Sequence, residues 1–162
     1  MDLDTLLRAL EATAFATAIR ENESLFPWVE SVHVLAITLV VGSIAIVDLR
    51  LMGLASRDRA ASAVAAEVLP CVWAAFGVAA LSGALLFSSN ALSYAHNSYF
   101  QAKLAFLVLA GANMAVFHLF AGPEHDGRGA RIAGAISLVL WICVVACGRW
   151  TGFTLHAIPL AS

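Results

Sequence analysis

Four apolar blocks alternate with short polar segments along the chain. They cover residues 28–47, 68–87, 103–121 and 132–148. Each is close in length to the ~20 apolar residues that cross a bilayer as a helix. This pattern predicts an all-α integral membrane protein. We expect one domain over residues 1–162, in which the four spans form an antiparallel bundle with short connections.

A different periodicity marks residues 2–22. Leu3, Leu7, Leu10 and Ala14 recur at helical spacing, with charged residues between them. The spacing predicts a short amphipathic helix that is too polar to cross the membrane. We expect this helix to lie at the membrane surface or to pack on the ends of the bundle.

Composition agrees with a membrane location. Of the 162 residues, 61% are hydrophobic and 12% are charged, whereas about 25% of the residues of an average soluble domain are charged. A chain this short has no soluble core large enough to bury so much apolar surface. The net charge of −2 provides no basic surface for nucleic acid. The first twenty residues also lack the basic start and the apolar core of a signal peptide.

The first span carries charges near both ends, and these charges predict its depth. Glu30 and Asp48 are 18 residues apart, which is ~27 Å of helix and close to the ~30 Å thickness of the hydrocarbon layer. We therefore expect Glu30 to mark one membrane face, called face A, and Asp48 to mark the other, called face B. His33 then lies one turn inside face A. The segment 48–67 is expected to be solvated.

The distribution of basic residues predicts the orientation. Face B carries five basic residues in two short loops, and face A carries four. The positive-inside rule then places face B in the cytoplasm. Both termini are expected outside, which is the periplasm in a Gram-negative cell.

Ionisable residues within a membrane are costly and are therefore candidates for function. Glu30, His33 and His118 qualify, and Asn113 is a polar neighbour. His118 follows Lys103 by 15 residues, or ~22 Å of helix, and so is expected near face B. His33 and His118 are then separated by roughly 18 Å along the membrane normal, too far to share one haem iron.

Three histidines are predicted to gather at face A: His33, His96 and His156. His33 with either of the other two would make a bis-histidine site for b-type haem. All three together would suit copper or zinc, since imidazole binds both metals. The simpler alternatives are that His96 and His156 are solvated loop residues, and that His33 makes an interhelical hydrogen bond.

Glu30 has two possible roles at the same face. Arg149 is predicted at that face, so the two side chains would form an ion pair that stabilises the end of the bundle. Alternatively, the carboxylate of Glu30 would orient the second ring nitrogen of His33, as carboxylates beside metal ligands do. The two roles are compatible.

Three segments carry a family resemblance. VESVHVLAITLVVGSIAIVDLRLMG, FQAKLAFLVLAGANMAVFH and the GRW that follows the fourth span resemble an uncharacterised family of small bacterial four-helix membrane proteins, a domain of unknown function. The resemblance covers nearly the whole chain. It implies a bacterial inner-membrane location and no particular activity. More loosely, the plan is similar to the membrane domains of copper-resistance proteins and to small b-type cytochromes, which also carry histidines near their membrane faces.

These observations favour a membrane redox subunit. It would bind b-type haem through His33 and a second face-A histidine, and pass electrons between a periplasmic donor and quinone or a partner subunit. One alternative is a haem-free transporter or metal-binding protein that uses the same residues. Another is a structural or assembly subunit in which Glu30, His33, Asn113 and His118 only hold helices together. Small residues along the second span also favour a homo-oligomer.

Overall fold

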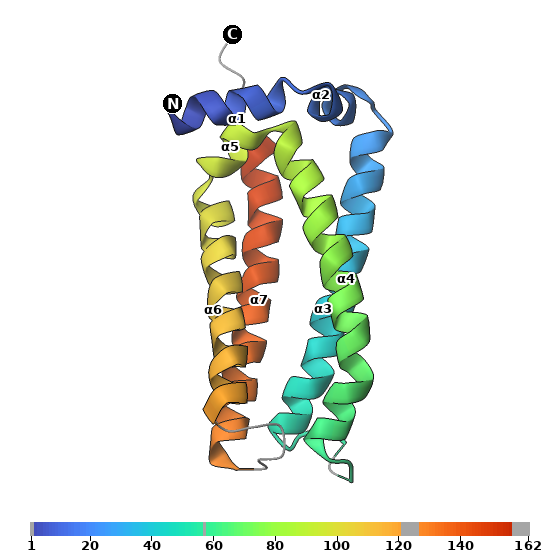
Figure 1. The fold of residues 1–162 in the computed structure, drawn as a ribbon, viewed down its shortest axis with the longest axis vertical. Coiled ribbons are helices and arrows are strands. Elements are labelled where there is room, and N and C mark those ends of the chain that lie inside the picture. Colours follow the sequence, from blue (N-terminus) through green and yellow to red (C-terminus); the bar gives the residue numbers. More distant parts are fainter. Residues whose placement is uncertain (1, 57, 121–126, 157–162) are drawn as a thin grey trace.

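A computed structural model describes residues 2–56, 58–120 and 127–156, and within these ranges the fold consists of helices without strands. Three short helices, α1 (Leu3–Glu11), α2 (Ala14–Glu21) and α5 (Ala91–Ala95), lie at one end of the molecule (Figure 1). The four long helices are α3 (Leu25–Leu51), α4 (Ala61–Ser89), α6 (Ser98–Phe120) and α7 (Arg128–His156). The all-α prediction is confirmed for this part of the chain.

The four long helices are apolar on their outer surfaces. They contain 27, 29, 23 and 29 residues, and each has a window hydrophobic enough to cross a membrane in which at most 17% of the residues are buried. Large side chains such as Leu81, Val108 and Leu119 are more than two-thirds exposed. In water such surfaces would be strongly unfavourable, so these outer faces are suited to contact with lipid.

The long helices pack as two pairs. α3 packs on α4 and α6 packs on α7, and the two pairs are joined where α3 contacts α7. In the described part of the chain, the backbones of α4 and α6 do not pack on each other. Figure 1 shows α6, in yellow to orange, at the left of the view and α4, in green, at the right. Residues of both helices line the two cavities described below.

The buried core is small and lies near the middle of the bundle. Val40 of α3 packs with Val72 and Ala75 of α4, and Trp141 of α7 packs against this cluster. Because a membrane protein does not rely on a large apolar core, close packing between few residues is sufficient to fix the helix pairs.

The N-terminal segment forms two helices where the sequence predicts one. Thr13 interrupts the pattern because its side chain accepts a hydrogen bond from the amide of Ala16 (3.3 Å) and so caps α2. Glu11 accepts a hydrogen bond from the amide of Leu92 in α5 (2.8 Å). Arg20 donates to the carbonyl of Ser89 at the end of α4 (3.1 Å). These bonds hold α1 and α2 across the face-A end of the long helices.

The long helices extend beyond the predicted spans, and this corrects the expected environment of one segment. α3 continues through residues 48–51, which were expected in a solvated loop. Asp48 and Arg50 are 4% and 6% exposed. The interpretation of Asp48 as a solvated marker of the membrane face is therefore wrong. The backbone hydrogen bonds of α3 continue through this turn. The neighbouring helix α7 covers it, which explains why it is buried.

Candidate functional site

A cavity of about 680 Å³ lies toward face A and is lined by residues of all four long helices and of α5. We call it the A-side cavity. Its polar and charged lining residues are Glu30, His33, Thr38, Tyr94, Lys103, Arg149 and Thr151. The rest of the lining is apolar side chains and glycines. Its volume falls within the ~300–1,000 Å³ typical of small-molecule and cofactor sites.

His33 is held on the wall of the A-side cavity by α4. Its Nδ1 lies 3.0 Å from the hydroxyl oxygen of Ser82. The Ser82 hydroxyl donates to the carbonyl of Val78 (2.6 Å), so its oxygen is available to accept a hydrogen bond from His33. This network favours the tautomer with the proton on Nδ1, which leaves a lone pair on Nε2. The backbone of Ala79 in α4 also lies close enough to hydrogen-bond the imidazole.

A glycine makes room for the imidazole. A Cβ at Gly83 would lie 2.9 Å from His33 Cε1, which is closer than real side chains approach. The ring therefore packs directly on the backbone of α4. Ser82 and Gly83 together determine both the position and the hydrogen bonding of His33, and neither residue was singled out from the sequence.

Two cations reach the A-side cavity from α6 and α7. Lys103 is half-buried and close enough to His33 for their charges to interact. The side chain of Lys103 passes Gly148 of α7, where a Cβ would be 3.7 Å from its Cδ. The guanidinium of Arg149 lies 4.5 Å from the ring centre of Phe153, a cation–π contact. The cavity therefore combines one imidazole with two positive charges and the carboxylate of Glu30.

Three aromatic rings close the face-A end of the cavity. Phe87 stacks on Phe100 with ring centres 5.5 Å apart, and Tyr94 meets Phe100 edge-on at 5.4 Å. Tyr94 belongs to α5, outside the long helices. Burial, and secondly the negative charge of Glu30, raise the pKa of the Tyr94 phenol above its ordinary value. Tyr94 is therefore a neutral hydroxyl at physiological pH.

The other two face-A histidines have different surroundings from His33. His96 is exposed, with its Nε2 3.6 Å from Asp4 and its Nδ1 3.0 Å from the carbonyl of Leu92. It does not line the A-side cavity. His156 is the last residue of α7, and its side chain lies outside the described part. Where the structure describes side chains, no three His, Cys, Asp or Glu residues gather as metal ligands do.

Glu30 and Arg149 both line the A-side cavity, but the expected ion pair between them is not formed. Elsewhere, Arg59 pairs with Glu67, and His96 lies 3.6 Å from Asp4. Arg149 packs on Phe153 instead. Because this cation–π contact is made within a single helix, it needs no movement of a neighbour.

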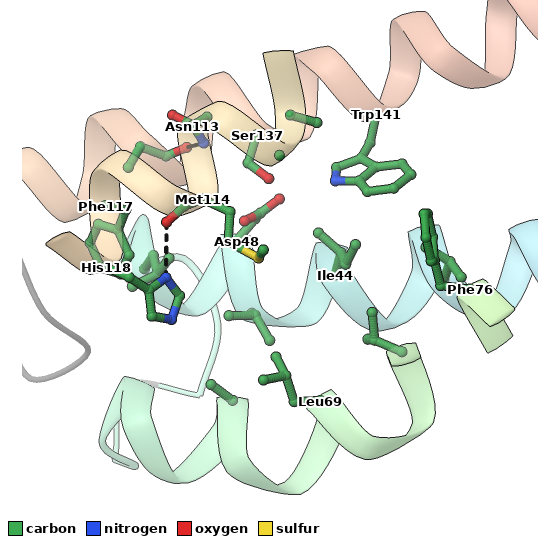
Figure 2. Close-up of a pocket in the computed structure, with 18 of the residues that line it drawn as sticks. Ile44, Asp48, Leu69, Phe76, Asn113, Met114, Phe117, His118, Ser137 and Trp141 are labelled. Carbon is green, nitrogen blue, oxygen red and sulfur yellow. Dashed lines mark hydrogen bonds between the residues drawn. The ribbon is translucent and has the colours of Figure 1, made fainter. Parts of the chain in front are cut away.

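A second cavity, of about 310 Å³, lies toward face B (Figure 2). We call it the B-side cavity. Its lining is mostly apolar, with four polar side chains: Asp48, Asn113, His118 and Ser137. Asn113 donates to the carbonyl of Ala133 in α7 (3.1 Å), and His118 bonds the carbonyl of Met114 in its own helix (2.9 Å). His33 and His118 therefore line different cavities at opposite ends of the bundle.

Asp48 is the polar residue at the centre of the B-side cavity. One of its carboxylate oxygens, Oδ2, is buried without a hydrogen-bond partner among the described residues. Val40, Ile44 and Asp48 follow one another at four-residue intervals and share the inward face of α3, but α3 is apolar on every side, so its sequence does not mark which face is inward.

Four long apolar helices with lipid-suited outer faces make this chain a multi-pass membrane protein. A family model covers residues 23–154, nearly all of the four-helix region, and the chain belongs to that family, the family of unknown function DUF6644. This confirms the resemblance to an uncharacterised domain. No curated protein and no solved structure matches the chain.

Proposed function

We propose that the A-side cavity binds a b-type haem with His33 as an axial ligand, and that the protein acts as a membrane redox subunit. The observation that carries the proposal is the hydrogen bond between His33 Nδ1 and Ser82. It orients the imidazole and leaves Nε2 able to bind iron, the arrangement that groups beside metal-bound histidines commonly enforce. Bound haem would supply one-electron transfer.

The shape and charge of the cavity support the same ligand. A haem has a flat apolar ring system and two carboxylates at one edge. The apolar lining and the aromatic side chains Phe87 and Phe100 suit the ring system. Lys103 and Arg149 supply positive charge for the carboxylates. Lys103 is half-buried and Arg149 is exposed, so both can reach an anionic group at the edge of a ligand.

The second axial ligand stays a prediction. His96 and His156 were the candidates for it from the sequence. His96 would have to leave Asp4 and turn away from the end layer of α1 and α5 to reach the cavity. His156 ends α7 at the same face, which makes it the better candidate. Copper bound by the same histidines is the alternative. It is the weaker proposal, because no three His, Cys, Asp or Glu side chains gather in the part of the chain that the structure describes.

Titration of the purified protein with haemin tests the proposal. The wild type should develop a Soret band that saturates at one haem per chain. His33→Ala should bind haemin at least tenfold more weakly, since it loses the ligand to the iron. His118→Ala, which alters the other cavity, should bind like the wild type. No saturable band in the wild type, or an unchanged titration of His33→Ala, would reject haem binding at His33.

A second variant separates ligand orientation from folding. Ser82→Ala removes the acceptor for His33 Nδ1 and should weaken haemin binding about tenfold, at the lower end of what such neighbouring groups contribute. Ser88→Ala is the matched control, because the Ser88 hydroxyl bonds only the carbonyl of Leu85 in the same helix. Equal affinities of these two variants would contradict the proposed orientation of His33. A wild type that binds no haem would instead favour a structural subunit or a haem-free transporter.

The membrane arrangement forms part of the same proposal. We place the four long helices as an antiparallel bundle in the bacterial inner membrane, with α1 lying as an amphipathic helix at the periplasmic surface. Five basic residues at face B favour the cytoplasm for that face. The A-side cavity then lies at the periplasmic end of the bundle, the end that an electron donor would approach. Quinone or a partner subunit would accept the electrons, and a homo-oligomer would bring the small-residue faces of α4 together.

A further inference from the structure

We infer that the B-side cavity is a separate binding site for a lipid-soluble hydroquinone, with the Asp48 carboxylate accepting a hydrogen bond from a hydroxyl of its ring. The site does not depend on haem, because its residues belong to the other end of the bundle. Asp48 follows His33 by 15 residues on α3, or ~22 Å.

Asp48 is the first observation that points to a ligand. The residue is only 4% exposed, and its Oδ2 atom is buried with no hydrogen-bond partner in the described part of the chain. Leaving such an acceptor unpaired is costly, more so when it is charged. Ser137 is near enough to interact with the carboxyl group but does not satisfy this oxygen. The position therefore lacks a donor.

The cavity around Asp48 is the second observation. Figure 2 shows the Asp48 carboxyl pointing from α3 toward Ser137, with Asn113 beyond it and with Trp141 and Phe76 farther along the same space. A volume of about 310 Å³ reaches the lower end of the range for small-molecule sites. A flat ring suits aromatic walls of this kind, since stacked and edge-on contacts between rings are favourable.

The route of access favours an uncharged ligand. The cavity has α4 on one wall and α6 on the other, and these two helices do not pack on each other where the structure describes them. A ligand that enters between them arrives from the hydrocarbon layer. A fixed cation is costly to place there, whereas a hydroxyl on an apolar ring is not. A hydroquinone with an alkyl tail has a hydroxyl that can donate to Asp48, a flat ring for the aromatic walls, and a tail that makes it soluble in lipid.

Intrinsic tryptophan fluorescence tests this inference, because Trp73 and Trp141 line the B-side cavity. The purified protein in detergent is titrated with an alkyl-substituted hydroquinone and, separately, with its dimethyl ether, which has the same ring and tail but no hydroxyl. The hydroquinone should bind saturably and about tenfold or more tightly than the ether, the effect of one hydrogen bond to a charged group. The comparison uses the wild type, so it does not depend on the folding of a variant.

Variants then locate the site. Asp48→Asn should weaken hydroquinone binding about tenfold and leave the ether unchanged. Glu67→Gln is the matched control, because its carboxylate is exposed on α4 and pairs with Arg59; it should bind like the wild type. Equal affinity for hydroquinone and ether, or binding unaffected by Asp48→Asn, would overturn the inference. So would an apolar amine that binds more tightly than the hydroquinone and depends on Asp48, since the site would then take a cation.

Discussion

The imidazole of His33 lies so close to Gly83 that a Cβ at position 83 would be 2.9 Å from its Cε1. The two residues belong to adjacent helices, α3 and α4, and the contact places the ring within reach of Ser82. A glycine in the interior of a helix costs about 0.5–1 kcal/mol relative to alanine. The fold tolerates this cost at Gly83, because the missing side chain lets the imidazole of His33 pack on the backbone of α4.

Gly83→Ala should therefore displace His33. The added methyl group forces the ring away from Ser82, and overpacking of this kind costs about 1–3 kcal/mol. We expect a lower midpoint of thermal unfolding in detergent and weaker haemin binding. Gly77→Ala on the same helix is the control, because a Cβ there meets no atom within 4 Å; it should be neutral or stabilising. Equal behaviour of the two variants would show that the His33–Gly83 contact is looser than described.

Gly134→Ala should open the contact between α3 and α7. A Cβ at Gly134 would lie 2.9 Å from the backbone carbonyl oxygen of Asp48 and 3.1 Å from Leu51 Cβ. Neither atom can rotate away, so the helices must separate. We expect a loss of about 2–3 kcal/mol in the free energy of unfolding, near the upper end for overpacking. Gly129→Ala is the matched control in thermal unfolding, because a Cβ there meets open space. If Gly134→Ala is as stable as Gly129→Ala, the contact between α3 and α7 is not as close as described.

The phenol of Tyr94 should titrate at a higher pH than free tyrosine, because burial and then the charge of Glu30 raise its pKa. Above the ordinary tyrosine pKa of about 10, the native protein keeps a proton that the unfolded chain has lost. The free energy of unfolding is thus unaffected below that pH and falls as the pH rises toward the pKa of the folded state.

Phenolate absorbance measures this titration. The chain has two tyrosines, so Tyr99→Phe leaves Tyr94 as the reporter. In that background Glu30→Gln should move the Tyr94 pKa part of the way back toward its ordinary value, and Glu67→Gln at the other face should not move it. An unchanged titration in the Glu30 variant would show that burial alone raises the pKa.

Asn97 should be important for the start of α6. Its side-chain oxygen accepts from the amides of Tyr99 and Phe100 (3.0 and 3.1 Å), and its amide donates to Thr154 of α7 (2.7 Å). Asn97→Ala should cost about 1–2 kcal/mol, as the loss of a helix cap does. Thr154→Val removes only the bond to α7 and should cost less. Hydrogen exchange at the first turn of α6 distinguishes the two, and equal protection in both variants would exclude a capping role.

The sequence was informative about His33 and much less so about its partners. An imidazole inside an apolar span is visible from hydropathy alone. Ser82 and Gly83 lie 49 and 50 residues farther along the chain, within a span rich in small residues, where nothing distinguishes them from neighbours. Lys103 looked like the polar end of a span. Only the packing of α3 on α4 and the approach of α6 bring these residues to one cavity.

The hydrophobic pattern by itself determined that four helices of this chain are long and apolar enough to cross a membrane, because hydrocarbon tolerates no unpaired backbone and few charges. It also predicted that His33 and His118 lie toward opposite ends, because helix rise converts sequence spacing into depth. Only the tertiary structure decided that Asp48 faces inward without a partner, and that α4 and α6 stand apart around two cavities. Those features depend on how each helix is rotated and paired, and one-dimensional hydropathy does not encode rotation when a helix is apolar on every side.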